Sequence, residues 1–246
     1  MASLRPTDEY IYRYETHCHT SWCSGCAHNT PQEMAEAYYR AGYTGLIFTD
    51  HFLTGNTAID RSLPWEEKVK AYYSVYEAGR AWAAQKKRDG GRDFHVLFGI
   101  EHHYGHGKEV LTYGIDLDFL LMHPNIDRLP LEQYAPLVRE YGGFLSMAHP
   151  FRRRGYIDMD FQPQPEFLDG AEVYNYCNSE LDNREAFELA GLYHLLPTSG
   201  GDVHSDDFEG IGQSGLAFKV PITTNEELVR TLRSGDYRLI IHGETI

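Results

Sequence analysis

Long hydrophobic runs are absent from the sequence, which has no stretch near the roughly 18 consecutive apolar residues of a membrane-spanning helix. The first segment, Met1 to Tyr14, is polar and mixed in charge, so it lacks the apolar centre of a secretory signal peptide. With 42% hydrophobic and 24% charged residues, the composition is that of a globular protein. We therefore expect no membrane association and a cytoplasmic location.

Basic residues are few: 22 Lys and Arg stand against 36 Asp and Glu, which gives a formal charge of -14. A protein that binds nucleic acid as a scaffold needs a basic surface to displace counterions from the phosphates, so we expect no such partner. A small phosphorylated substrate remains compatible with this charge, because bound metal ions reverse the sign of the potential locally.

Cysteine is also sparse, with four residues: Cys18, Cys23 and Cys26 in one early segment, and Cys177. Without a signal peptide we expect free thiols, at most one of them a metal ligand, and no disulfides. Internal repeats, low-complexity tracts and Pro/Ser-rich linkers are absent as well. A chain of 246 residues then fits a single domain over residues 1–246, as a monomer or an oligomer.

The pattern that is present alternates short β-rich runs with longer helical ones. The predicted strands are Tyr12 to Thr16, Gly45 to Thr49, His95 to Ile100, Phe119 to Met122, Phe144 to Ala148, Gly170 to Val173 and Leu196 to Ser199. The predicted helices are Pro31 to Ala41, Trp65 to Lys87, Leu131 to Tyr141 and Asn183 to Leu192. A strand from Leu216 to Val220, a helix from Asn225 to Arg233 and a strand from Tyr237 to Ile241 follow. Repeated βα units favour an α/β fold with a mostly parallel sheet, either open or closed into a barrel.

Each of the seven predicted strands leads into a residue that can bind a metal ion. In chain order these residues are His17 and His19, Asp50 and His51, Glu101, His123, His149, Glu172, and Asp202 and His204. A barrel gathers the C-terminal ends of all its strands around one mouth, whereas an open sheet brings together only the strands beside its switch point. The distribution therefore favours a barrel.

Imidazole and carboxylate groups are the donors that zinc, manganese and iron accept in proteins. In His17-Cys18-His19 the two imidazoles are two residues apart, so they point to the same side of a strand and can bind one ion. The pair Asp202 and His204 has the same spacing. Before Asp202, two glycines leave room for the backbone to approach the site.

These motifs resemble those of the polymerase-and-histidinol-phosphatase (PHP) superfamily. The matching residues are Thr16-His17-Cys18-His19-Thr20, Thr49-Asp50-His51, Gly99-Ile100-Glu101, Ala148-His149-Pro150, Glu172-Val173-Tyr174-Asn175 and Gly201-Asp202-Val203-His204. The resemblance implies a distorted seven-stranded (β/α) TIM-like barrel that hydrolyses phosphoesters with two or three divalent ions: Zn, Mn or Fe. It assigns one ion to His17, His19, Glu101 and Asp202, a second to Glu101, His123 and His149, and a third to His51 and His204.

Two positions depart from the family pattern. A histidine that often ligates the third ion is replaced at the best-matching position by Cys26, and His28 lies two residues further. A thiolate binds zinc or iron, so we predict Cys26 as the ligand, with His28 as the alternative. The flanks of His123 match the family poorly, and Pro124 follows it.

Further residues near the predicted mouth suggest supporting roles. Arg152 or Arg153, which follow His149-Pro150 closely, would donate hydrogen bonds to phosphate oxygens. The predicted catalytic residues are these arginines together with Glu101 and Asp202. Asp50 is expected to accept a ring N–H from a metal-bound histidine, and Glu172 to orient a ligand or the water nucleophile; a purely structural role is the alternative for each. His102 and His103 are left outside the predicted ligand set.

The predicted function is hydrolysis of a small phosphate ester by metal-activated hydroxide. A phosphomonoester such as histidinol phosphate and a phosphodiester are both candidates. One alternative is an amidohydrolase-type enzyme, but such barrels usually carry a carboxylated Lys as the bridging ligand, and none is expected near this site. Another is a non-catalytic metal-binding or regulatory domain.

Overall fold

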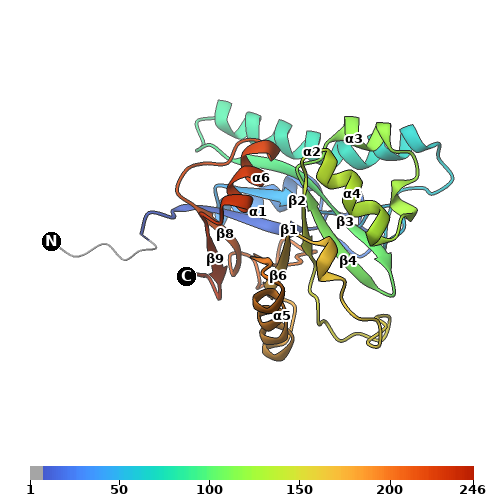
Figure 1. Cartoon of the computed structure of the whole chain (residues 1–246). Helices are drawn as coiled ribbons and strands as arrows, with labels where there is room; N and C mark the ends of the chain where they lie inside the picture. Colours follow the sequence, from blue (N-terminus) through green and yellow to red (C-terminus); the bar gives the residue numbers. More distant parts are fainter. Residues whose placement is uncertain (1–7) are drawn as a thin grey trace.

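A computed structural model describes residues 8–246 of the protein (Figure 1). Of the segment Met1 to Tyr14, residues 1–7 thus lie outside the described part. Figure 1 shows one curled sheet, with α2, α3 and α4 on one side of it and α5 on the other. The α/β class expected from the sequence is confirmed.

The strands of the described chain form one ten-stranded sheet in the order β10-β9-β8-β1-β2-β3-β4-β5-β6-β7. Their bounds are β1 Tyr12–Cys18, β2 Gly45–Phe48, β3 His95–Gly105, β4 Lys108–Tyr113, β5 Phe144–Met147, β6 Gly170–Asn175, β7 Leu196–Gly200, β8 Ser214–Phe218, β9 Arg238–Ile241 and β10 Glu244–Thr245. The helices are α1 Pro31–Arg40, α2 Trp65–Arg88, α3 Leu117–Met122, α4 Leu131–Glu140, α5 Glu180–Tyr193 and α6 Asn225–Ser234, with short 3-10 turns at Ile126–Arg128 and Pro165–Phe167.

The predicted count of seven strands is wrong in two places within the main body of the sheet. The segment Phe119 to Met122, predicted as a strand, belongs to helix α3, because the Asp116 side chain accepts a hydrogen bond from the Phe119 N–H and caps the helix. The strand next to β3 is instead β4, which pairs with β3 in an antiparallel hairpin. The short strand β10 was also not predicted.

Several helices begin where the sequence places a capping residue. Thr30 and Glu33 form a reciprocal capping box at the start of α1, and Ser179 and Asp182 form one at the start of α5. At the end of α6, Gly235 takes a φ of 70°, the left-handed backbone that favours glycine as a helix stop. These local signals explain why most of the predicted helix boundaries agree closely with the structure. The start of α5 is the exception, because it was predicted at Asn183 and lies at Glu180.

Side chains inside the curled sheet form a hydrophobic layer below the site. It includes Tyr14 of β1, Ile47 of β2 and Leu97 of β3, with Leu228 and Leu232 of α6 packed against them. The alternate residues of the same strands face the outer helices in a second, larger cluster. Because strand side chains alternate, the residue four positions after Leu97 and Ile47 faces the mouth in each case: Glu101 and His51. In β1 a register shift between Glu15 and Cys18 interrupts this alternation.

The direction of the strands determines which residues meet at this mouth. Strands β1, β2 and β3 run parallel, as do β5, β6 and β7, whereas β4 is antiparallel to both β3 and β5. The end of β7 returns to β1: the His19 N–H donates to the Val203 carbonyl at 2.9 Å, and the Thr16 hydroxyl donates to the Ser199 carbonyl at 2.6 Å. The C-terminal ends of six strands and the start of β4 therefore share one mouth.

The longest helix, α2, carries many charged residues. Among the described residues, no helix has both the length and the apolar character that crossing a membrane requires.

Candidate metal centre

Potential metal ligands from six strands converge at the mouth. Four overlapping groups each place three ligand atoms within 4.8 Å of one another: His17, His19 and Asp202; His17, Glu101 and His149; His19, His51 and His204; and His51, Glu101 and Glu109. All but two of these eight side chains are buried. Residues spread over most of the sequence thus come together as the sequence predicts, with Glu109 as an addition.

Glu172 fixes the orientation of His17. The Nδ1–H of His17 donates to Glu172 Oε1 at 3.0 Å, and both side chains are fully buried. Because Nδ1 carries the proton, Nε2 presents a lone pair toward the cluster. Glu172 Oε2 also accepts from the His149 backbone N–H and from Asn175 Nδ2, so this carboxylate orients two predicted ligands.

Asp50 acts on His19 through Ser24, not directly as the sequence suggested. The Ser24 hydroxyl donates to Asp50 Oδ1 at 2.7 Å, so its oxygen accepts from His19 Nδ1 at 2.9 Å. This order fixes the proton of His19 on Nδ1 and leaves Nε2 free to bind an ion. Burial raises the pKa of Asp50 to about 6, against the hydrogen bonds from Ser24 and Thr20 that lower it.

Four buried polar atoms at the centre of the cluster have no hydrogen-bond partner within the described residues 8–246. They are His17 Nε2, His19 Nε2, His51 Nδ1 and Glu101 Oε2. The imidazole nitrogens nevertheless lie 2.7 to 3.5 Å from the Glu101 oxygens. A buried polar atom without a hydrogen bond costs free energy. Because these atoms lie close together and do not hydrogen-bond to one another, a cation bound between them would satisfy them. The residues present therefore fit divalent metal ions.

The electrostatics of the cluster support the same conclusion. Burial lowers the pKa of the His17 ring, but the surrounding carboxylates, Glu172 above all, raise it well above its ordinary value. Burial raises the pKa of Glu101, yet His17 and His51 hold it well below its usual range. Carboxylates that draw protons onto neighbouring imidazoles form a site of negative potential, which divalent cations would neutralise.

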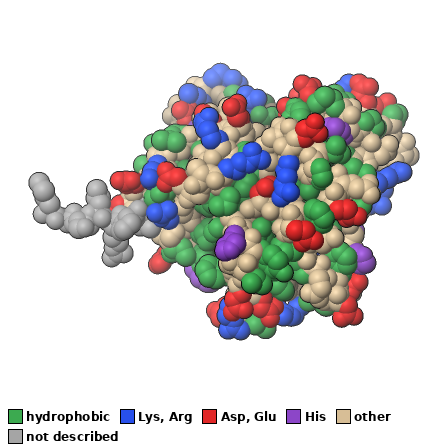
Figure 2. Space-filling view, viewed as in Figure 1, with side chains coloured by type: hydrophobic (Ala, Val, Ile, Leu, Met, Phe, Trp, Pro, Cys, Tyr) green, Lys and Arg blue, Asp and Glu red, His purple; other side chains and the backbone are tan. Residues whose placement is uncertain are grey.

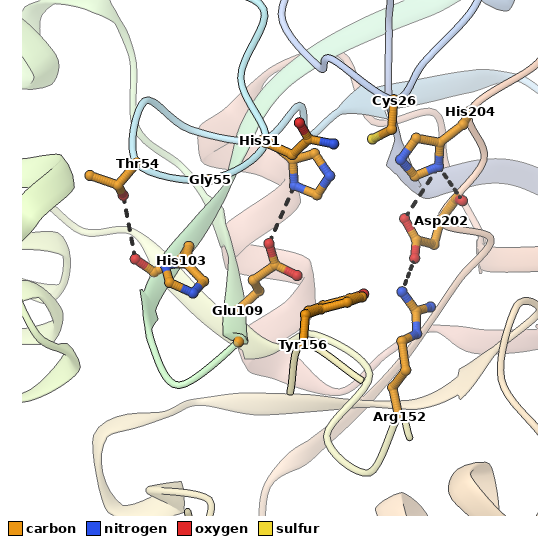
Figure 3. A pocket seen from close by; sticks show the side chains of 12 residues that line it. Cys26, His51, Thr54, Gly55, His103, Glu109, Arg152, Tyr156, Asp202 and His204 are labelled. Carbon is orange, nitrogen blue, oxygen red and sulfur yellow. Dashed lines mark hydrogen bonds and ion pairs between the residues drawn. The ribbon is translucent and has the colours of Figure 1, made fainter. Parts of the chain in front are cut away.

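Cys26 lies beside His51 and His204, with its sulfur turned toward the His204 ring (Figure 3). Burial raises the pKa of its thiol, but hydrogen bonds with His204 and His51 lower it to about 6. His28 is exposed. Of the two alternatives left by the sequence, the structure brings Cys26, and not His28, beside His51 and His204, although Cys26 is outside the four ligand groups found among the described residues.

The backbone is unusual at two predicted ligands. His149 has a φ of 31° and Asp202 a φ of 53°, in the left-handed region of the backbone that residues other than glycine rarely adopt. Beside Asp202, a Cβ on Gly200 would lie 2.4 Å from Glu172 Oε1, and one on Gly201 2.6 Å from the Val203 side chain. The two glycines therefore allow the close approach that the sequence suggested.

Glu15 is a buried carboxylate that sequence analysis did not single out. Its Oε1 accepts from three backbone N–H groups, those of Thr16, His17 and Gly201. Its Oε2 accepts from the hydroxyls of Tyr38 and Ser214. Burial raises the pKa of Glu15, against these hydrogen bonds. The carboxylate thus holds the end of β1, and with it the His17 backbone, against the residue that follows β7.

A cavity of about 500 Å³ opens onto the cluster. Four predicted ligands lie in its wall: Cys26, His51, Asp202 and His204. The remaining wall residues lie outside the predicted ligand set: Thr54, Gly55, Asn56, His103, Gly107, Glu109, Arg152 and Tyr156 (Figure 3). Of the histidine pair set aside in the sequence, His103 reaches the cavity, whereas His102 stacks on Tyr134 and contacts the Leu129 carbonyl.

The two arginines after Pro150 lie differently. Arg152 is 7% exposed and donates to Asp202, to Asn178 Oδ1 and to Asn175 Oδ1. Arg153 pairs instead with Asp182 and Glu185 of helix α5. The structure therefore brings Arg152 to the cavity and not Arg153.

His123 does not join the cluster. It follows the last residue of α3, its ring contacts Phe119, and it belongs to none of the ligand groups. The expectation of a ligand there depended on a strand that is a helix. Glu109, on the strand that actually follows β3, was missed. The sequence held a signal for it, because Gly105-His106-Gly107 lies between two β-rich runs and is typical of a hairpin turn.

No family model and no curated protein matches the chain. Solved structures do match. A two-domain protein from Bacteroides vulgatus that contains a predicted PHP-like metal-dependent phosphoesterase shares 15% identity over 97% of this chain and 67% of its own, with a TM-score of 0.67. A lesion-specific endonuclease from Pyrococcus furiosus shares 13% identity over 93% of this chain and 57% of its own, with a TM-score of 0.63. An amidohydrolase from Chromobacterium violaceum shares 16% identity over 94% of this chain and 98% of its own, with a TM-score of 0.54.

At these identities the likeness establishes the fold. The chain therefore shares its fold with a protein that contains a predicted PHP-like domain, which agrees with the fold class implied by the resemblance of the sequence motifs.

Proposed function

We infer that this chain, which has the PHP fold and gathers the PHP motif residues at one mouth, is a metal-dependent phosphoesterase. The observation that carries the proposal is the set of buried ligand atoms left without partners: His17 Nε2, His19 Nε2, His51 Nδ1 and Glu101 Oε2. Hydrogen bonds to Glu172 and Ser24 orient the rings of His17 and His19, so that their Nε2 lone pairs point toward the centre.

The proposed ligands follow the family assignment. His17, His19, Glu101 and Asp202 hold one divalent ion, Glu101 and His149 contribute to a second, and His51, His204 and Cys26 hold a third. Zn, Mn and Fe are the candidate metals. Such ions, when bound, would polarise phosphoryl oxygens and lower the pKa of a bound water to about 7.

Arg152 is the residue that we propose to orient the phosphate. A guanidinium has five N–H groups, and the contacts with Asp202, Asn175 and Asn178 use three of them. The others can donate to phosphate oxygens in the cavity, while the ion pair with Asp202 holds the side chain in place. Glu101 and Asp202 complete the proposed catalytic set as metal ligands.

We propose a small phosphate ester as the substrate, in a cytoplasmic protein. The cavity of about 500 Å³ has the size of a small-molecule site. Acidic and basic side chains are interspersed on the face shown in Figure 2, and the formal charge is -14. Wrapping a nucleic-acid duplex on such a surface would be electrostatically unfavourable. The endonuclease among the structural matches makes duplex DNA the competing substrate.

The structure gives little support to amidohydrolase chemistry that uses a carboxylated lysine. One lysine, Lys108, lies at the start of β4 beside Glu109, but its ammonium donates to the Pro150 carbonyl at 3.1 Å. Glu101, which belongs to two of the four ligand groups, is the residue that we propose as the bridging ligand.

The test is a substrate panel. Purified protein loaded with Mn, Zn or Fe is assayed with phosphomonoesters, phosphodiesters and a DNA duplex that carries an abasic lesion. We expect turnover of a small ester and its loss in the Glu101→Gln variant. Cleavage of the duplex alone would overturn the small-substrate proposal. Inactivity toward every phosphoester, with metal bound, would overturn the phosphoesterase proposal itself.

A further inference from the structure

Strand β4 introduces a carboxylate into the cluster from the direction opposite to the other strands. Because β4 runs antiparallel to β3 and β5, its first residues, not its last, lie at the mouth. Glu109 is the second residue of β4. In the ladder with β3, Leu111 pairs with Glu101 and Glu109 pairs with His103, so these side chains share the inward face.

The Glu109 carboxylate is placed between two predicted ligands. Its Oε1 lies 3.3 Å from His51 Nδ1, and its Oε2 lies 3.6 Å from His149 Nε2. The same His149 nitrogen is 3.0 Å from Glu101 Oε1. Figure 3 shows the Glu109 side chain pointing toward His51 across the cavity. His149 thus lies within 3.6 Å of both carboxylates, and Glu109 also forms a ligand group with His51 and Glu101.

Among the described residues, Glu109 forms ion pairs with histidines alone. The nearest basic residues along the chain or in the cavity are committed elsewhere: Lys108 donates to the Pro150 carbonyl, and Arg152 pairs with Asp202. Glu109 is nevertheless only 8% exposed. Its carboxylate faces the cavity beside the other potential ligands, where it is available to bind a metal ion.

We propose that Glu109 ligates the ion held by Glu101 and His149, in the place that the sequence assigned to His123. This inference rests on the proposed metal-dependent function and concerns one ligand of it. Exchanging an imidazole for a carboxylate leaves this position with two acidic ligands and one nitrogen. Carboxylates suit harder ions such as Mn²⁺, whereas imidazole suits Zn²⁺ well. The second site is therefore better suited to Mn²⁺ than the same site with histidine in place of Glu109 would be.

The test compares Glu109→Gln with Glu109→His. Glutamine keeps the size of the side chain and removes the charge, and histidine restores a ligand with nitrogen as donor. Glu132→Gln, at an exposed position of α4, is the matched control. Each protein is stripped with a chelator and reloaded with Mn²⁺ or Zn²⁺. The bound ions per chain are then counted by mass spectrometry of the metals, and circular dichroism follows the fold.

We expect Glu109→Gln to hold one Mn²⁺ fewer than the wild type and Glu132→Gln to hold the full number. Glu109→His should regain the missing ion with Zn²⁺ but not with Mn²⁺, which also shows that the lost ion does not reflect misfolding. Equal Mn²⁺ content in Glu109→Gln and the wild type would overturn the inference. The count is independent of turnover: a wild type that binds these ions without hydrolysing any phosphoester contradicts the proposed function and not the role of Glu109.

Discussion

Replacing Glu172 by Gln tests whether the contacts behind the cluster hold its ligands in a metal-binding state. Glu172 accepts three hydrogen bonds: from His17 Nδ1 at 3.0 Å, from the His149 N–H at 3.0 Å and from Asn175 Nδ2 at 2.8 Å. Glutamine has nearly the same shape, but one of its two terminal positions is an NH₂ group, which cannot accept.

Either orientation of the new amide is unfavourable. If NH₂ faces His17, the ring must move its proton to Nε2, which is the atom that faces the cluster. If NH₂ faces the other side, it meets the donors of His149 and Asn175. A buried donor without an acceptor costs about 1–3 kcal/mol, and loss of such an outer contact lowers metal affinity by about 10–100-fold. We therefore expect the dissociation constant of the ion that we assign to His17 to rise by about that factor in Glu172→Gln.

Competition titration against a fluorescent chelator measures this constant directly. Glu188→Gln, at an exposed position of helix α5, is the control for the loss of one carboxylate from the protein. Far-ultraviolet circular dichroism confirms that both variants are folded. An affinity within twofold of the wild type in a folded Glu172→Gln protein would refute the reasoning that Glu172 fixes the His17 tautomer.

Four further predictions follow from the contacts described above. Glu15→Ala leaves five buried donors without an acceptor and should lower the free energy of unfolding by more than about 3 kcal/mol. An unchanged urea midpoint would contradict this. Ser24→Ala breaks the link to His19 and should weaken metal binding by about 10–100-fold in the same titration, whereas an unaltered constant argues against the link. Chelation of the metal should lower the melting temperature, since an ion at 100 times its dissociation constant stabilises by about 2.7 kcal/mol; identical melting with and without chelator counts against bound ions. Arg152→Lys should lower kcat/KM by at least about tenfold, while Arg153→Lys should change it little; equal effects of the two changes would remove the special role of Arg152.

Most of the cluster could be predicted because its residues follow buried parallel strands. His17, His19, His149 and Asp202 each lie within two residues of the C-terminal end of a strand, where chain direction determines that they meet. Glu101 lies inside β3, beside His51. Their spacing within short motifs carried this information locally. The tautomers of His17 and His19 could not be predicted, because they depend on contacts with residues distant in the sequence.

The region between Glu101 and Phe144 was predicted least well. A run of four apolar residues, Phe119 to Met122, fits a short strand and a short helix equally, and the cap by Asp116 decides for the helix. Expecting a helix after every strand also hid the hairpin of β3 and β4. Glu109 was missed for that reason, because a ligand at the beginning of a strand has no place in a purely parallel pattern.

The choice between Arg152 and Arg153 depends on a different kind of information. The two residues are neighbours in one charged loop, and nothing in the sequence distinguishes them. The acidic residues Asp182 and Glu185 on α5 bind Arg153, whereas Asn175 and Asn178 guide Arg152 toward Asp202. Only the position of α5 beside this loop settles which arginine reaches the cavity.

The measurement that tests the account most directly is phosphoester hydrolysis by the same preparation before metal removal, after chelation and after reloading with Mn²⁺ or Zn²⁺. The account predicts turnover that disappears with the ions, returns when they are restored, and is absent from Glu101→Gln under all three conditions. Turnover that survives complete removal of the ions, or a fully reloaded protein that hydrolyses no phosphoester, would contradict it.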